Sequence, residues 1–296
     1  MLWFLFRLVK VLGVVGILIF SWAIGGYGID TIFVTILPQK WVVDRIVGDD
    51  FEVISVVDRG MNPHSFDITP SMMNKIASSK VYFTIGLGDS EDNLVSTLRK
   101  SFPNLNIVDV SKGVNKIRFT HSHSGCFEHN HRHSSLDPHI WTSPLNMKII
   151  AKNVFEEVSR IRPERESFYR ERYLQLINEL DDLHKEIKKM LEPFRGRRFM
   201  VFHSAFKYFE KEYGVIEVSI EYEGKEPTPK QIRCIIDEAK RNRVRVVFVQ
   251  TGFSQKSAKI IADEINGLVE EINQLDYNYI DNMKFIASKI RDSYSK

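Results

Sequence analysis

The chain has 296 residues, which on a prior of about 150 residues per domain predicts two domains with buried cores. Hydrophobic residues make up 43% and charged residues 27%, with only 16 Gly and 10 Pro, which argues against collagen-like, Pro/Gly-rich and disordered classes. The net charge of +3 falls to +1 without the first 23 residues, so no basic field predicts nucleic-acid binding.

The N-terminus has the pattern of an export signal. Arg7 and Lys10 precede an unbroken apolar run over 11–20, too short to span about 30 Å of hydrocarbon as a helix. Small residues before a cleavage site after Ala23 complete the pattern, so we predict a signal peptide over 1–23 and a periplasmic protein. No cysteine follows the run, so a lipid anchor is not expected; the alternative is an uncleaved membrane anchor.

After the signal, short β-type runs alternate with stretches of helical period. The expected elements are strands at 31–36, 51–57, 80–85 and 106–110, and helices at 41–47, 70–79 and 91–101. Such alternation is typical of βαβ units and predicts a mainly parallel sheet with helices on both faces.

A stretch of about 30 residues, 111–143, interrupts this pattern. Loops of that length inside a compact domain are usually functional or disordered. From residue 144 to about 191 the sequence is helical and heavily charged, interrupted only by Pro163. A helix of about 28 residues after Pro163 would extend about 40 Å. We expect a spine that joins two lobes and, because it is a single stiff helix, little hinge motion.

The rest of the chain repeats the alternation of strands and helices that is expected in the first lobe. The expected elements are strands at 198–202, 215–220, 244–250 and 268–275, and helices at 205–213, 229–241, 254–266 and from 279 onward. The expected fold class is α/β, with two similar lobes of mainly parallel sheets flanked by helices, one long rigid linking helix and a ligand site in the interlobe cleft. The predicted division is a signal peptide over 1–23, an N-terminal lobe over 24–143 that includes a His-rich loop at 118–136, a helical spine over 144–194 and a C-terminal lobe over 195–296.

Four side chains that suit a metal stand at or just beyond the ends of expected strands: His64, His139, His203 and Asp276. Two come from each lobe, so all four are expected to converge on the cleft. Imidazole and carboxylate suit Zn²⁺, with Mn²⁺ or Fe²⁺ as alternatives because a carboxylate hardens the site. For any one histidine, a surface or satisfied core position is the competing interpretation, and Asp137 before Pro138 is also typical of a plain turn.

Several segments carry a resemblance to a known family: NPHSF around His64, LDPHIWTSP around His139, FHSAFKYFEKEYG around His203, EPTPKQI at 226–232, and the block over 235–264. Over residues 30–296 the chain resembles the solute-binding proteins of ABC transporters for zinc and manganese, the cluster A-I type. The resemblance implies two α/β lobes joined by a rigid helix, with one metal between them. Carried over residue by residue, it implies the ligands His64, His139, His203 and Asp276.

The chain departs from that family pattern at three positions. Asn62 stands where an acidic residue is frequent, Gln250 replaces a frequent Glu, and Tyr277 follows Asp276 in place of the usual Pro. We expect the first two departures to remove charge near the ligands rather than a ligand. The third bears on Asp276 itself, so a water or another carboxylate is the alternative fourth ligand.

Five of the nine histidines fall within thirteen residues: His121, His123, His129, His131 and His133. They resemble the His-rich loop of zinc-specific members, and alternating imidazoles capture borderline metals less well as pH falls. The loop therefore favours zinc over manganese, the alternative being a solvated loop with incidental metal affinity. His184 matches no motif and is expected at the surface. Cys126 and Cys234 are far apart in sequence, and nothing in the sequence indicates whether they pair.

The sequence as a whole predicts a binding protein rather than an enzyme. The leading interpretation is a monomeric, high-affinity zinc-binding component of an ABC transporter that captures the ion in the periplasm and delivers it to a membrane permease. The alternatives are a manganese or iron component of the same family, a metal-linked adhesin and a zinc-dependent hydrolase. A hydrolase needs an open metal position and a general base, and the HExxH pattern is absent from the sequence.

Overall fold

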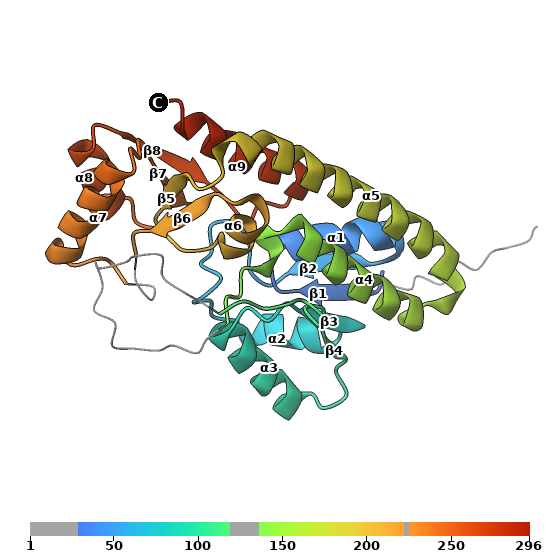
Figure 1. The fold of residues 1–296 in the computed structure, drawn as a ribbon. Helices are drawn as coiled ribbons and strands as arrows, with labels where there is room; N and C mark the ends of the chain where they lie inside the picture. The colour runs from blue at the N-terminus through green and yellow to red at the C-terminus, as the bar shows by residue number, and fades with distance from the viewer. Residues whose placement is uncertain (1–28, 119–135, 222–224) are drawn as a thin grey trace, which may run out of the picture.

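The computed structural model describes residues 29–118, 136–221 and 225–296 (Figure 1). It has two α/β lobes joined by a long helix, as expected. The predicted signal peptide and the five clustered histidines lie outside the described residues. Within the described ranges, no helix combines the length and apolar character needed to cross a membrane.

The first lobe is built on a parallel sheet with strand order β2-β1-β3-β4. Its elements are β1 (Thr31–Val34), α1 (Leu37–Val47), β2 (Glu52–Ser55), α2 (Pro70–Ala77), β3 (Val81–Thr84), α3 (Asp89–Ser101) and β4 (Ile107–Asp109). Each predicted element is present. Helix α1 begins four residues before the expected start because Pro38, which lacks an N–H, fits its first turn.

The second lobe repeats this order in a parallel sheet β6-β5-β7-β8. Its elements are β5 (Arg198–Val201), α6 (Lys207–Tyr213), β6 (Ile216–Ser219), α7 (Pro229–Arg241), β7 (Val246–Gln250), α8 (Lys256–Glu264), β8 (Leu268–Ile272) and α9 (Tyr279–Ser293). Strand β8 ends three residues earlier than expected, since the side chain of Asn273 accepts the N–H of Leu275 at 3.0 Å and turns the chain. Asp276 therefore lies in the β8–α9 loop and not directly after a strand.

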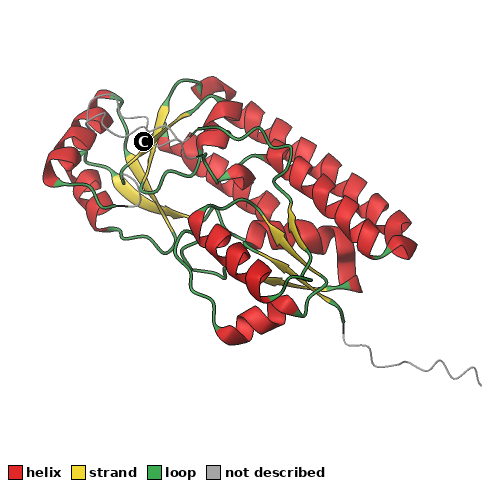
Figure 2. Cartoon of the chain, turned by 90° about the horizontal axis from the view of Figure 1, so that it is seen from below, coloured by secondary structure: helices red, strands yellow, loops and turns green. Residues whose placement is uncertain are grey.

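Two long helices, α4 (Pro144–Ile161) and α5 (Glu166–Leu191), lie between the sheets in sequence. The part of the chain that the structure describes also has four short 3₁₀ turns: η1 (Gly48–Asp50), η2 (Ile140–Thr142), η3 (Pro163–Arg165) and η4 (Glu192–Phe194). Helix α5 packs on α1 and α4 of the first lobe and on α6 and α9 of the second (Figures 1 and 2). Helix α5 is the spine predicted from the sequence, and a break at Pro163 separates it from α4.

The alternation of side chains along the strands divides the core. Phe33 and Tyr82 face helices α2 and α3, whereas their neighbours Val34 and Phe83 face the opposite side of the first sheet. That opposite side and one face of the second sheet, which includes Phe248, belong to one continuous apolar cluster built around α1, α4, α5 and α9. The lobes thus share a core, and a rotation of one lobe against the other would open it.

Candidate metal site

Three histidines from separate segments meet between the lobes. His64 lies in the loop between β2 and α2, His139 immediately before η2, and His203 just after β5. Their Nε2 atoms are 3.0 Å apart for His64 and His139, 3.2 Å for His64 and His203, and 3.1 Å for His139 and His203. Among the described residues, these three are the only group of three or more His, Cys, Asp or Glu side chains close enough to share a metal ion.

The spacing of these nitrogens suits a small cation. Three nitrogens bound at about 2.0 Å to a tetrahedral Zn²⁺ lie about 3.3 Å from one another, close to the separations observed. Three imidazoles cannot all satisfy one another, because a ring nitrogen without a proton accepts but does not donate. A cation that takes all three lone pairs resolves this contact.

Asp137 orients the ring of His139. Its Oδ1 accepts the backbone N–H of His139 at 2.8 Å and lies 2.9 Å from Nδ1 of the same residue. Asp137 is therefore the turn former that the sequence suggested and also the partner of the ring. With Nδ1–H donating to this carboxylate, Nε2 keeps its lone pair for a metal. Burial lowers the pKa of His139, and the nearby Asp137 opposes that shift.

His203 is held on three sides. It follows β5, where the strand order of the second sheet reverses, the usual ligand position in open α/β sheets. Its Nδ1 contacts the carboxylate of Glu221. The side-chain amide of Gln250 accepts its backbone N–H at 3.0 Å and donates to its carbonyl oxygen. Phe253 stacks on the ring with centroids 4.7 Å apart.

His64 is held by its backbone. Its N–H donates to Oδ1 of Asn62 at 2.9 Å, and its carbonyl oxygen accepts the hydroxyl of Ser90 at 2.6 Å. Burial, together with the rings of His139 and His203, lowers the pKa of His64 to about 2. The ring is therefore neutral near pH 7 and able to ligate a metal.

The carboxylates around the cluster favour a divalent ion. Asp137 is fully buried and Glu221 is 5% exposed, and each carboxylate contacts a ring nitrogen on the side away from the other imidazoles. Oδ2 of Asp137 has no hydrogen-bond partner among the described residues. Buried charges are costly unless they are balanced, and a dication between the rings balances these two.

The segment that carries His139 is attached to the second lobe. The indole N–H of Trp141 donates to the carbonyl oxygen of Gln274 at 3.0 Å, and the hydroxyl of Tyr279 donates to the carbonyl oxygen of Trp141 at 2.8 Å. The hydroxyl of Ser143 contacts Glu212 on α6. His139 and His203 are consequently held by one packed unit.

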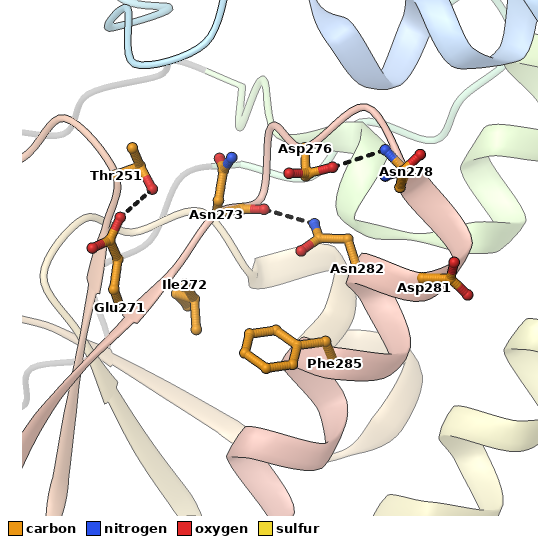
Figure 3. A pocket seen from close by; sticks show the side chains of 9 residues that line it. All are labelled: Thr251, Glu271, Ile272, Asn273, Asp276, Asn278, Asp281, Asn282 and Phe285. Atoms are coloured by element: carbon orange, nitrogen blue, oxygen red, sulfur yellow. Dashed lines mark hydrogen bonds between the residues drawn. The ribbon is translucent and has the colours of Figure 1, made fainter.

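Asp276, the predicted fourth ligand, lies outside the three-histidine cluster. It lines a cavity of about 430 Å³, together with Thr251, Glu271, Ile272, Asn273, Asn278, Asp281, Asn282 and Phe285 (Figure 3). Its Oδ1 accepts the backbone N–H of Asn278 at 2.8 Å. The structure thus brings together three of the four predicted ligands, and ligation by Asp276 stays a prediction.

The sequence interpretation missed Glu221 and was wrong about His184. The signal for Glu221 was its place two residues beyond β6, the strand paired with β5, because the carboxyl ends of neighbouring parallel strands meet at one edge. His184 was expected at the surface, but its side chain is 20% exposed and its ring packs on Tyr213. Its Nδ1 lies 3.3 Å from the Tyr213 hydroxyl, because it faces inward from α5 onto α6.

Comparisons with known proteins match most of the chain to metal-binding proteins. A family described as zinc-uptake complex component A, periplasmic, matches residues 32–293. A putative metal-binding protein of Chlamydia trachomatis is 28% identical over 238 residues, which cover 79% of this chain and 81% of that protein. The manganese ABC transporter substrate-binding lipoprotein PsaA of Streptococcus mitis is 26% identical, over 86% of each chain. A crystal structure of ZnuA has a TM-score of 0.82 and 30% identity, over 89% of this chain and 98% of that one.

Proposed function

The chain belongs to the periplasmic zinc-uptake component A family, and from this premise we propose that it captures Zn²⁺ and delivers it to a membrane permease. The family comprises metal-binding components of ABC transporters for zinc or manganese, and these are not enzymes. The observation that carries the choice of zinc is the convergence of three Nε2 atoms within 3.0–3.2 Å. Three imidazole nitrogens suit Zn²⁺ better than the harder Mn²⁺, which prefers oxygen.

The proposed ligand set is His64, His139 and His203, with Asp276 as the fourth ligand. The three histidines are supported by their geometry, and Asp276 by the family resemblance. A closed shell of four protein ligands suits tight capture, whereas a catalytic zinc keeps an open position. The five histidines at 121–133 are proposed as an auxiliary capture segment that raises the local supply of metal.

We propose that the lobes move little when metal is bound or released. The shared apolar core joins one face of each sheet to the same helices, and α5 runs along both lobes. Release then depends on local movement of a ligand. A metal-free crystal form whose lobes had rotated apart by tens of degrees would contradict this.

Competitive calorimetry of the purified chain with Zn²⁺ and Mn²⁺, together with element analysis of the protein as isolated, tests the function. One tight Zn²⁺ site is expected, lost in His203→Ala and kept in His184→Gln, the control for a half-buried histidine outside the cluster. Preference for Mn²⁺ at the tight site would keep the transport role and overturn the choice of zinc. Absence of any tight site would overturn the function.

A further inference from the structure

The three histidines differ in how their rings are fixed. His139 and His203 are 1% and 7% exposed, and a buried carboxylate contacts the Nδ1 of each. Both belong to segments packed on the second lobe, as Trp141 and Gln250 show. Neither ring can leave without uncovering a buried carboxylate, which is costly.

The ring of His64 has weaker support. Within the described ranges its ring contacts the other two imidazoles, and its side chain is only half-buried. The loop that carries it, residues 56–69 between β2 and α2, is exposed over 58–61. Movement of this ligand leaves no buried carboxylate without its partner.

This His64 loop contacts both lobes beside the ligands. The hydroxyl of Ser90, in the first turn of α3, donates to the carbonyl oxygen of His64 at 2.6 Å. On the other side, Gly60 of the loop lies against Gly252 of the second lobe. Gly252 has φ +87°, and a Cβ added to it would lie 3.0 Å from the carbonyl oxygen of Gly60. The loop therefore bridges the lobes beside the ligands, and the Ser90 hydroxyl joins His64 to a segment outside the loop, whereas Asn62 holds the histidine from within it.

We propose that His64 is the ligand that detaches first when the metal is released, and that Ser90 is the positioning residue that sets how long His64 stays in place. His139 and His203 then hold the ion, together with the fourth ligand, until it is transferred. This inference rests on the proposed metal-binding function and specifies the step by which the ion leaves.

Dissociation and association of zinc in Ser90→Ala test the inference in the full chain. Zinc is loaded below one equivalent, so that the tight site fills first, and its loss to an excess of chelator is followed by stopped flow. Loss of one hydrogen bond is expected to raise the dissociation rate by roughly tenfold. The association rate and the melting temperature are expected to stay near the parent values, because the His139–His203 pair still receives the ion.

Two variants serve as controls. Ser90→Thr keeps the hydroxyl and should restore slow dissociation. Thr97→Ala removes a hydroxyl that donates to the carbonyl oxygen of Asn93 at 2.9 Å in the same helix, away from the site, and should change nothing. Hydrogen exchange at residues 60–66 should rise in Ser90→Ala and not in Thr97→Ala, a readout that general destabilisation of α3 would not confine to this loop.

The outcomes separate the two proposals. A parent chain without a tight zinc site would overturn the proposed function. A parent chain that binds one zinc tightly, combined with an unchanged dissociation rate in Ser90→Ala, would overturn only the role of Ser90 and the His64 loop. An equal rise in Thr97→Ala would overturn it as well, since the effect would then come from the helix.

Discussion

The hydroxyl of Tyr208 donates a hydrogen bond of 2.7 Å to the carbonyl oxygen of Asp137. Tyr208 lies on α6, which follows His203, and Asp137 orients the ring of His139. The same hydroxyl accepts the backbone N–H of Ile117 at 3.3 Å. One phenol thus joins the segments that carry two of the three metal ligands, and links both to the first lobe.

Replacement of this phenol tests the coupling. Tyr208→Phe leaves a buried carbonyl oxygen and an amide without a partner, so the free energy of unfolding should fall by about 1–3 kcal/mol. Zinc affinity should fall by about fivefold as the Asp137 turn relaxes. Calorimetry and thermal unfolding measure the two effects. Tyr294→Phe is the matched control, because that hydroxyl is 3.5 Å from its acceptor; equal effects in both variants would contradict the coupling.

The contact between Glu221 and His203 is expected to contribute to zinc affinity. Carboxylates that hold the far nitrogen of a ligating histidine contribute about 10- to 100-fold in metal affinity, so Glu221→Gln should weaken zinc binding by that order. The ¹⁵N shifts of the His203 ring should show a mixed tautomer in place of Nδ1–H alone. Glu271→Gln, which alters an exposed carboxylate bonded to Thr251, should leave both readouts unchanged. A Glu221→Gln chain with parent affinity would show that the contact does not support the ligand.

The proposed fourth ligand has its own test. Asp276→Asn keeps an oxygen that can accept the N–H of Asn278 and removes the negative charge. If Asp276 completes the shell, zinc affinity should fall by about tenfold or more, and the zinc absorption edge should report the loss of a carboxylate oxygen. Asp281→Asn, in the same cavity, is the control. Parent affinity in Asp276→Asn would assign the fourth position to water or another group.

Much of the fold was predictable because the spacing of hydrophobic residues agrees with the residues that begin and end helices and strands along the chain. Pro229 begins α7 where Thr228 caps it, and the alternation of strands and helices fixes two parallel sheets. The three ligating histidines were predictable from their strand-end positions and motifs. Glu221 was not singled out, because its role depends on the pairing of β6 with β5 and not on local pattern. Asp276 was placed at a strand end because the Asn273 turn went unrecognised.

Glu212 is expected to make the free energy of unfolding depend on pH. Burial raises its pKa to about 7, Ser143 contacts one of its oxygens, and His184 lies 3.8 Å from the other. Between pH 4.5 and 7 the native state binds more protons here than the unfolded state, so the free energy of unfolding decreases as pH rises. Well above pH 7 Glu212 is ionised in the folded state, and its burial then lowers the free energy of unfolding by up to about 3 kcal/mol.

Glu212→Gln removes this titration. Denaturant unfolding should show the variant to be more stable than the parent at pH 8 and nearly equal to it near pH 4.5. Glu192→Gln, an exposed carboxylate at the end of α5, should follow the parent at both values. A difference between Glu212→Gln and the parent that did not change with pH would contradict the assignment to Glu212.

The five histidines at 121–133 lie outside the described residues and are predicted to bind metal separately from the tight site. Arg118 and Leu136, which flank the segment, pair in an antiparallel bridge, and the N–H of Asp137 donates to the carbonyl oxygen of Ile117 at 2.9 Å. The two ends are therefore adjacent, and a short Gly-Ser linker in place of 120–134 should close the gap without strain at Asp137. Zinc titration should then show fewer bound ions and an unchanged tight site.

A chain of unchanged length with the five histidines replaced by serine distinguishes the effect of the imidazoles from the effect of the length of the segment. It should lose the same weak sites as the shortened chain. In the parent these sites should weaken below about pH 6, because imidazoles of ordinary pKa near 6.5 become protonated and no longer bind metal. Loss of the tight site in either variant would show that the segment supplies a ligand to the three-histidine cluster, and the division between capture and tight binding would be wrong.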